Sequence, residues 1–376
     1  MAPATADPTP DRGAAVAPQP PARTRRSPLL RLGLLALVLF VTGNLIARSF
    51  FSPFVGFEDW FPFLDRWKIF QYQTSYADLG FVRRGLIGTL LGIGPNRAPP
   101  MLLGFAAASS LAMAAVFVWL LAQVRQPELA RALLISPALF LGIGFDLGRF
   151  DHLNYLLMLV AVLRPGWALV LLAPAMLLIH EAAIASHVPL LLALHLQKRG
   201  LDTALWAAGV AAAATLAALL FLGREYSLAE LMLRYPLADT DALRVLNRGV
   251  GDNLAEVWDY ASNRIEPVLL MALVFPAAYL ALLGAIYLRL AGPGARLALL
   301  AALTPLALSP FGYDFTRWFG LAAINLTLLI CRAARRQDAR PTPRWALAGL
   351  VLFALPGPLG LVYPYPLAFE LLGRLF

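Results

Sequence analysis

The chain has 376 residues, of which 60% are hydrophobic and 14% are charged, and its formal net charge is +9. Soluble domains carry about 25% charged residues, so this composition excludes an ordinary soluble enzyme and predicts an integral membrane protein. The positive charge does not indicate nucleic-acid binding, because the arginines lie in short loops between apolar stretches. The single cysteine, Cys331, excludes an intrachain disulfide and a cysteine metal site.

The segment 1–27 is rich in proline, alanine and arginine and has no apolar periodicity. This composition predicts a disordered cytoplasmic tail. The apolar stretch 29–49 is long for the core of a signal peptide and lacks a clear cleavage site, so we expect an uncleaved first span. Residues 28–376 are predicted to form a single integral-membrane domain.

Eleven stretches have the apolar character of membrane-spanning helices, which need about 20 residues when regular and fewer when broken. They are 29–49, 100–123, 130–147, 151–164, 166–180, 182–197, 202–222, 267–290, 296–311, 315–332 and 344–363. The predicted fold class is therefore an all-α, polytopic protein with amphipathic helices in its outer loops. The three pieces within 151–197 are short, which is typical of helices that line a cavity. Residues 85–95 predict one more short, half-buried helix.

The distribution of charge orients these spans. With the N-terminus inside, the inner segments hold 17 of the 31 Lys and Arg residues but 5 of the 22 Asp and Glu residues. Positively charged loops stay on the cytoplasmic side, and the basic loop 332–344 requires this orientation. The topology predicts two large outer loops, about 50–84 and 223–266. It also predicts a multi-pass protein of the bacterial inner membrane whose polar clusters face the periplasm.

The first outer loop contains the adjacent acids Glu58 and Asp59, then Asp78, then the adjacent arginines Arg83 and Arg84. Neighbouring carboxylates shift each other's pKa, so the first two can act as a general base or bind a divalent cation. The two arginines can hold a phosphate through forked hydrogen bonds. The structural alternative is an amphipathic interfacial helix whose charges pair with one another.

One short pattern occurs twice, each time after a Ser-Pro dipeptide. Asp146 and Arg149 lie three residues apart with an aromatic residue behind them, and so do Asp314 and Arg317. Acids and arginines close to membrane depth are candidates for function. The structural alternative is an ion pair within each helix end, because residues at this spacing share a helix face.

Two pairs of polar residues lie within the apolar region 151–197. Asp151 and His152 directly follow the first repeat of the pattern, and His180 and Glu181 separate two apolar pieces. A histidine beside an acid can act as an acid–base pair. In the structural alternative, the second pair caps two broken helices through backbone hydrogen bonds. Zinc is not expected, because no second histidine lies at a ligand spacing.

The second large outer loop, 223–266, carries arginines among acids, together with aromatic residues that can stack on sugar rings. Its candidate residues for gripping a substrate are Arg234 and Tyr235, and the alternative is a solvated amphipathic loop. The sequence contains neither a glycine-rich nucleotide-binding motif nor a nucleophile elbow. ATP-driven chemistry at the inner face is therefore not predicted.

This layout resembles that of bacterial multi-spanning glycosyltransferases that use polyprenyl-phosphate-linked sugars, the GT-C class, and that of O-antigen polymerases. The resemblance implies that Glu58 or Asp59, in the first outer loop, is the general base. It also implies that the large arginine-bearing loop 223–266 belongs to a polymerase-like outer surface. The run 78–86 is similar to segments of bacterial envelope proteins. The chain departs from the polymerases because it lacks a clean repeated arginine motif.

Together these features predict a glycosyltransferase or glycan polymerase. It would transfer a sugar from a polyprenyl-(pyro)phosphate donor to a glycan or lipid acceptor at the periplasmic face, among membrane lipids. The candidate bases are Glu58, Asp59, Asp146 and Asp314, and the candidate phosphate ligands are Arg83, Arg84, Arg149 and Arg317. No organic cofactor is predicted, and a divalent cation is an option. The alternatives are a transporter or flippase of lipid-linked glycans and a non-catalytic envelope-assembly protein.

Overall fold

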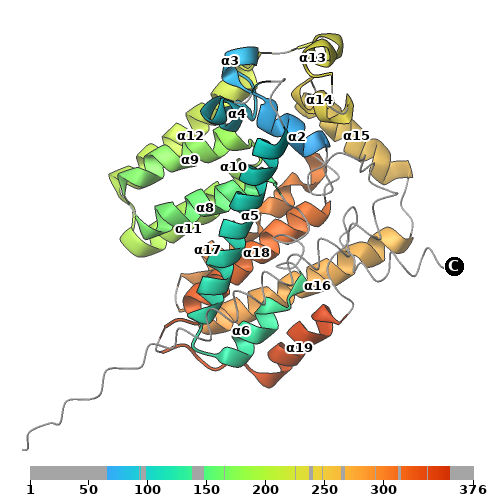
Figure 1. Ribbon diagram of the computed structural model, residues 1–376. Coiled ribbons are helices and arrows are strands. Elements are labelled where there is room, and N and C mark those ends of the chain that lie inside the picture. The colour runs from blue at the N-terminus through green and yellow to red at the C-terminus, as the bar shows by residue number, and fades with distance from the viewer. Residues whose placement is uncertain are drawn as a thin grey trace, which may run out of the picture.

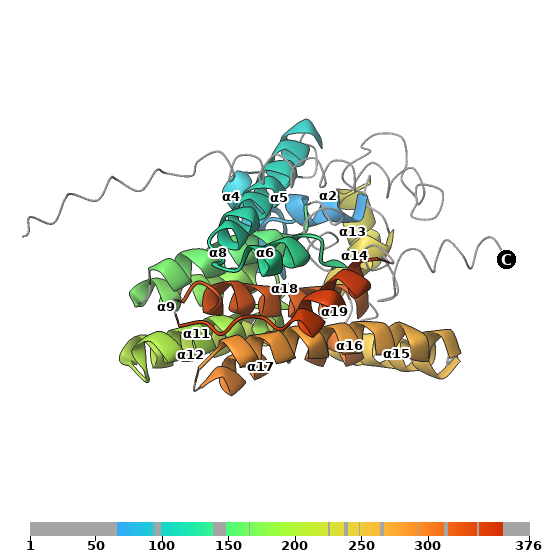
Figure 2. The same cartoon turned by 90° about the horizontal axis from the view of Figure 1, so that it is seen from below.

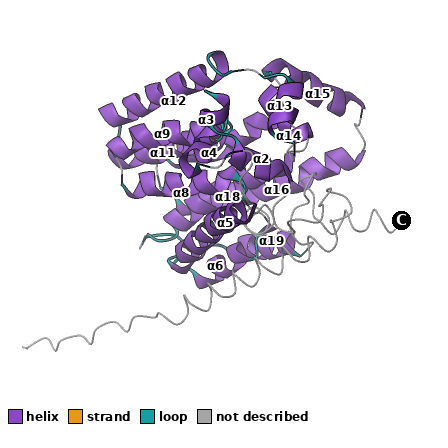
Figure 3. Cartoon of the chain, turned by 45° about the horizontal axis from the view of Figure 1, so that its top comes forward, coloured by secondary structure: helices purple, strands orange, loops and turns teal. Residues whose placement is uncertain are grey.

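The computed structural model describes residues 66–92, 94, 99–137, 148–164, 166–224, 226–236, 240–247, 249–263, 267–292, 294–311, 315–336 and 338–355. Within these residues helix is the only regular secondary structure (Figure 3), which confirms the all-α prediction. Several predicted features lie outside the described residues: the tail 1–27, the span 29–49, and the candidate acids Glu58, Asp59, Asp146 and Asp314.

The longer helices form the body of the molecule (Figure 1). They are α5 (Pro99–Ala122), α8 (Phe150–Leu163), α9 (Trp167–Ile179), α11 (Val188–Arg199), α12 (Thr203–Phe221), α16 (Pro267–Leu290), α17 (Ala295–Leu303), α18 (Phe315–Ala333) and α19 (Arg344–Ala354). Most coincide with one predicted span. The spans 182–197 and 296–311 are each divided, the first by α10 (Ala183–Ser186) and the second by the 3₁₀ helix η3 (Thr304–Phe311). The span 130–147 is described only at its start, where α6 (Pro127–Leu134) lies.

Particular residues cause the breaks between helices. Gly166 separates α8 from α9 and has a φ of +117°, a conformation that glycine adopts without steric cost. Extended backbone at His180 ends α9. Pro189 lies in the first turn of α11, where its missing N–H would have had no helical partner. The structure therefore contains the short, broken helices that the sequence predicts over 151–197.

Helix α18 is the central element of the body. Every side chain from Trp318 to Cys331 is buried, and the helix contacts α5, α16, α17 and η3. A helix that is buried all round belongs inside a helical assembly, and Figure 2 shows neighbouring helices on both sides of it. This packing fixes the position of its first turn, which carries Arg317.

Six further helices, of which all but α15 are short, lie together at one end of the body and are called the outer tier here (Figure 1). They are α2 (Arg66–Gln73), α3 (Tyr76–Leu79), α4 (Gly85–Leu91), α13 (Leu228–Arg234), α14 (Thr240–Asn247) and α15 (Val250–Asn263). A cluster that includes Tyr72, Ile87 and Phe150 attaches α2 and α4 to the body. A separate cluster around Tyr226 and Tyr235 attaches α13 and α14 to α2 and α3.

Loops that are predicted to share one side of a membrane contact each other. At one end, the amide of Arg224 donates to the carbonyl oxygen of Phe81 (2.8 Å), so that the two large outer loops meet. At the opposite ends of the helices, the side-chain amide of Gln126 donates to the carbonyl oxygen of Arg340 (2.9 Å), which joins two predicted inner loops. The helix directions therefore agree with the alternation that the charge distribution predicts.

Two segments in the described part of the chain, Gly104–Ala122 of α5 and Thr203–Phe221 of α12, are long and apolar enough to cross a membrane. The other described helices do not meet both conditions of length and hydropathy. The crossing of a bilayer by all eleven predicted spans therefore stays a prediction.

Gly88 of α4 packs directly on the backbone that follows α2. A methyl group at this position would overlap the carbonyl group of Thr74 and lie 2.8 Å from the carbonyl oxygen of Tyr72. We expect Gly88→Ala to lower the free energy of unfolding by about 2 kcal/mol, because relieving the overlap would displace α2. Gly209→Ala is the matched control, since its Cβ position in α12 meets open space and alanine favours helix. Unfolding in detergent measures both, and equal stability of the two variants would contradict the tight contact.

Candidate functional site

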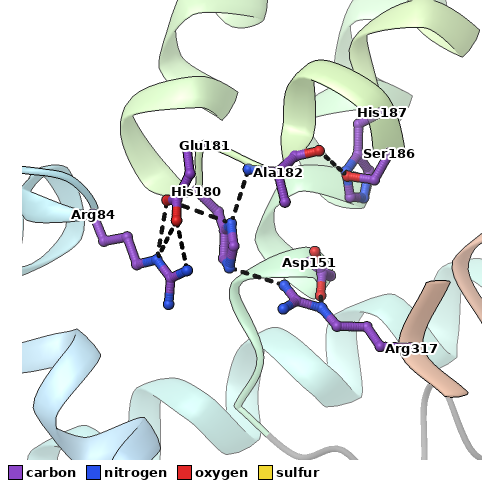
Figure 4. Close-up of polar contacts among 8 residues, drawn as sticks. All are labelled: Arg84, Asp151, His180, Glu181, Ala182, Ser186, His187 and Arg317. Carbon is purple, nitrogen blue, oxygen red and sulfur yellow. Dashed lines mark hydrogen bonds and ion pairs between the residues drawn. The ribbon is translucent and has the colours of Figure 1, made fainter. Parts of the chain in front are cut away.

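Four segments that are distant in sequence bring charged residues together where the body meets the outer tier (Figure 4). Arg84 immediately precedes α4, Asp151 lies in the first turn of α8, and Arg317 lies in the first turn of α18. His180 and Glu181 form the corner after α9. All five are residues that the sequence analysis singled out, and they are called the charged cluster below.

Arg84 and Glu181 form a forked ion pair. The Nε atom of Arg84 lies 3.1 and 3.0 Å from the two carboxylate oxygens of Glu181, and its Nη2 atom lies 2.6 Å from Oε1. The side chains are 10% and 25% exposed, so the pair lies at the edge of the buried interior. The Nη1 atom of Arg84 is buried without a hydrogen-bond partner among the described residues, so the forked pair does not use the N–H groups of this nitrogen.

The electrostatics of Glu181 follow from this pair. Burial alone would raise the pKa of the carboxyl group, but the adjacent guanidinium of Arg84 outweighs burial and holds this pKa well below its usual range. Glu181 also follows the C-terminal end of α9, where the helix dipole disfavours a negative charge. Arg84 is therefore the group that keeps Glu181 ionised, and loss of Arg84 would leave a carboxylate in an unfavourable place.

The backbone of Arg84 has a φ of +63°, and it is the one residue other than glycine with a positive φ in the described part of the chain. Such a conformation costs about 1–2 kcal/mol for a residue with a side chain. The forked pair with Glu181 offsets this cost and fixes the guanidinium in one orientation. The guanidinium of Arg84 is thus held in place by a constrained backbone and a forked ion pair, unlike that of a flexible surface arginine.

Arg317 bridges the other two members of the cluster. Its Nε atom donates to Asp151 Oδ2 (2.8 Å), and its Nη2 atom lies 2.9 Å from His180 Nε2. Both side chains of the ion pair are less than a tenth exposed, and the guanidinium stacks on the ring of Trp318 at 4.9 Å. Asp151 is also well placed for the dipole of α8, because it lies in the first turn.

His180 is uncharged in this arrangement. Its Nε2 atom faces the guanidinium of Arg317, and its Nδ1 atom accepts a hydrogen bond from the amide of Ala182 (3.1 Å). A neutral imidazole has one ring nitrogen with a free lone pair and an imidazolium has none, so the neutral ring can accept from one of these two donors, whereas a second proton on the ring would oppose both contacts. The neutral ring separates the two ion pairs, which lie on either side of it in Figure 4.

A buried polar network continues below the cluster. Tyr155, one helical turn after Asp151, donates to Oδ1 of Asn325 (2.9 Å), and the amide of Asn325 donates to the carbonyl oxygen of Ser186 (3.0 Å). The Ser186 hydroxyl lies 2.7 Å from His187 Nδ1. These contacts tie α8, α10 and α18 together, and thereby fix the segments that carry Asp151, Glu181 and Arg317.

This network lies outside the residues predicted from the sequence, although the sequence contains a usable signal for it. Tyr155 has the spacing that places it on the same helix face as Asp151, and Asn325 is an isolated amide in an otherwise apolar stretch. Another missed residue is Ser110 of α5, whose hydroxyl lies 2.7 Å from Nδ1 of His152. His152 therefore faces α5 rather than Arg317.

The remaining candidates lie outside the charged cluster. Arg83 turns away from Arg84, and its Nη2 atom donates to the carbonyl oxygen of Leu246 (3.3 Å) in the outer tier. Arg234 donates to the carbonyl oxygen of Asp78 (2.8 Å). Tyr235 is buried in the hydrophobic cluster of the outer tier and is therefore covered rather than presented to a sugar.

The repeated pattern of an acid and an arginine is described only in part. Arg149 is half-buried and immediately precedes α8, whereas its expected partner Asp146 lies outside the described residues, as does Asp314. Arg317 pairs with Asp151 of α8, so the second repeat contributes a contact between helices. Within the described residues, no group of three or more His, Cys, Asp or Glu side chains is placed to hold a metal ion.

We expect Glu181→Gln to lower the free energy of unfolding at neutral pH by about 3 kcal/mol, because it leaves the charge of Arg84 buried without a counter-ion. Since the pKa of Glu181 is lowered in the folded state, this stabilisation is present above the ordinary carboxyl pKa. It is lost as the pH falls through the lowered value. The effect of the substitution should therefore shrink in acid, which unfolding in detergent at several pH values measures.

The control for this prediction is Asp338→Asn. Asp338 pairs with Arg336 at 2.7 Å, but the two side chains are 69% and 54% exposed, and such surface pairs contribute little to stability. A loss for Glu181→Gln no larger than that for Asp338→Asn would contradict the buried ion pair. Combining Arg84→Gln with Glu181→Gln should cost less than the sum of the single substitutions.

Comparisons with known proteins add no information about the chemistry of this site. The sequence matches no known protein family, no curated protein and no solved structure at a significant level. The charged cluster, its contacts and its position at the helix ends are therefore the features that bear on function.

Proposed function

We propose that the chain is a multi-pass protein of the bacterial inner membrane, with its N-terminus in the cytoplasm and the charged cluster at the periplasmic face. The two apolar helices that are long enough to cross a bilayer support this proposal. So does the contact pattern, in which predicted outer loops meet at one end of the helices and predicted inner loops at the other. The inner loops also carry most of the excess positive charge.

Within that membrane, the proposed activity is glycosyl transfer or glycan polymerisation from a polyprenyl-(pyro)phosphate donor. The observation that carries the proposal is the convergence of Arg84 and Arg317 on the corner formed by His180 and Glu181. Two guanidiniums at the membrane boundary suit a phosphate group. The accompanying carboxylates suit removal of a proton from a sugar hydroxyl.

The reaction proposed is a single displacement at the anomeric carbon of the donor sugar. The acceptor hydroxyl oxygen forms a bond to this carbon, the bond from the carbon to the phosphate oxygen breaks, and the polyprenyl (pyro)phosphate leaves with the bonding electrons. The acceptor proton passes to a carboxylate. Negative charge develops on the departing phosphate, so the arginines stabilise the transition state more than the bound substrate.

Glu181 is the described acid that best fits the role of base. It is the more exposed partner of the forked pair, and its low pKa depends on Arg84. A phosphate that engages Arg84 would weaken this pairing, raise the pKa of Glu181 and so make it a stronger base. Donor binding would thereby prepare the base, in addition to any contribution from Glu58, Asp59, Asp146 or Asp314. Asp151 is less suited, because Arg317 stays bound to it.

The proposal is tested with purified protein, a polyprenyl-pyrophosphate-linked oligosaccharide and an acceptor glycan. We expect Glu181→Gln and Arg84→Gln each to lower the rate of transfer by about 100-fold or more. Arg164→Gln should leave the rate unchanged, because Arg164 is exposed at the opposite end of α8. Movement of the donor across proteoliposomes without bond cleavage would favour a flippase. Neither transfer nor movement would favour an assembly protein, and both results overturn the enzymatic proposal.

The membrane topology makes a separate prediction. The single native cysteine, Cys331, is fully buried, so cysteines introduced elsewhere can be labelled without a background signal. A membrane-impermeant maleimide added to intact spheroplasts should label Ala229→Cys, which is exposed on α13. It should not label Arg340→Cys, which is exposed in the basic loop, until the membrane is permeabilised. The reverse pattern would invert the proposed orientation.

A further inference from the structure

The outer tier contains a second arrangement of arginines, formed by Arg224 and Arg234 and called the outer arginine pair. Both guanidiniums lie over the ring of Tyr226, with their Cζ atoms 4.9 and 5.6 Å from its centroid. The two residues are exposed, whereas Tyr226 is only 3% exposed beneath them. Two like charges are therefore held at one aromatic ring.

The platform that holds this pair is rigid. The hydroxyl of Tyr226 donates to the carbonyl oxygen of Leu79 (2.6 Å), and the ring belongs to the hydrophobic cluster of the outer tier. The amide of Arg224 donates to the carbonyl oxygen of Phe81 (2.8 Å), and Nη1 of Arg234 donates to that of Asp78 (2.8 Å). Three contacts with carbonyl oxygens of the segment 78–81 thus fix the Tyr226 ring, the backbone of Arg224 and the guanidinium of Arg234.

Stacking on an aromatic ring leaves the donors of a guanidinium available. The ring contacts the flat face, while the N–H groups lie in the plane and point outward from its edges. Glu230 lies close enough to feel both charges, but its Oε2 atom accepts hydrogen bonds from the amide and the hydroxyl of Ser227, each 2.9 Å long. The acid is therefore engaged in capping α13, and the two arginines remain exposed to solvent, with Nη1 of Arg234 bonded to the carbonyl oxygen of Asp78.

We propose that the outer arginine pair is a binding site for a phosphate group, carried either by a lipid headgroup or by a soluble ester. A tetrahedral phosphate offers enough oxygens for two forks that approach together, whereas one fork already occupies both oxygens of a carboxylate. Because the arginines are already immobilised, less side-chain entropy is lost when a ligand binds. The site is separate from the charged cluster, and the proposal does not depend on the proposed glycosyl transfer.

Inorganic phosphate is the probe for the soluble source, titrated with protein in a neutral detergent and followed by broadening of its ³¹P resonance. Phosphatidylglycerol is the probe for the lipid source, counted by native mass spectrometry after release from nanodiscs. We expect Arg224→Gln to weaken phosphate binding about tenfold, the loss of roughly one charge-assisted contact. Binding of either probe that depends on the pair supports the site and identifies the source.

Two further variants separate a built site from diffuse positive charge. Replacing both arginines by lysine keeps the charge but removes the planar forks, so we expect this double variant to bind as weakly as Arg224→Gln. Arg164→Gln, at the opposite end of the body, should bind like the wild type. Unchanged broadening and unchanged lipid retention in Arg224→Gln, or full binding by the double-lysine variant, would overturn the proposal. Loss of glycosyl transfer in Arg84→Gln leaves it untouched, because the two sites share no residue.

Discussion

The burial of Arg317 is the constraint on which the rest of the structure depends. A guanidinium that is almost wholly removed from water requires a counter-charge and hydrogen-bond partners for its planar donors. Asp151 supplies the first, and His180 and the ring of Trp318 supply further contacts. Because α18 is packed on all sides, the guanidinium cannot move to its partners. Helices α8 and α9 must instead present Asp151 and His180 to it, which sets their rotation.

The outer tier is attached to this centre in two steps. Helices α2 and α4 pack on α5, α8 and α9 through one apolar cluster, and α13 and α14 pack on α2 and α3 through another. The first step carries Arg84 to Glu181, and the second places Arg224 and Arg234 above Tyr226. Two candidate anion sites thus lie on successive layers of one surface, linked by the short segment 78–84.

Much of this arrangement follows from local patterns that a sequence contains. Apolar stretches locate the helices, and Gly166 and Pro189 locate two of the breaks. Charged residues within or beside apolar stretches point to Asp151, His180, Glu181 and Arg317, and the adjacent arginines of the first outer loop point to Arg84. Which charged side chains form ion pairs with each other does not follow from these local patterns. The pattern around Arg317 suggests a partner three residues away and does not reveal Asp151 on another helix, because packing of α18 against the body brings that acid within reach. Likewise, Arg83 and Arg84 look equivalent in sequence, and only backbone geometry sends them to different layers.

Because adjacent arginines diverge, the backbone at residue 84 couples the position of the outer tier to that of the charged cluster. One side chain reaches α14 in the upper layer and the next reaches the corner after α9, and a single peptide unit of about 3.8 Å separates their Cα atoms. Arg84 lies in the left-handed region of backbone conformation. This region is narrow, so the φ and ψ angles of Arg84 have little freedom to change. A tilt of α14 relative to the body would therefore strain both the contact of Arg83 with Leu246 and the pairing of Arg84 with Glu181.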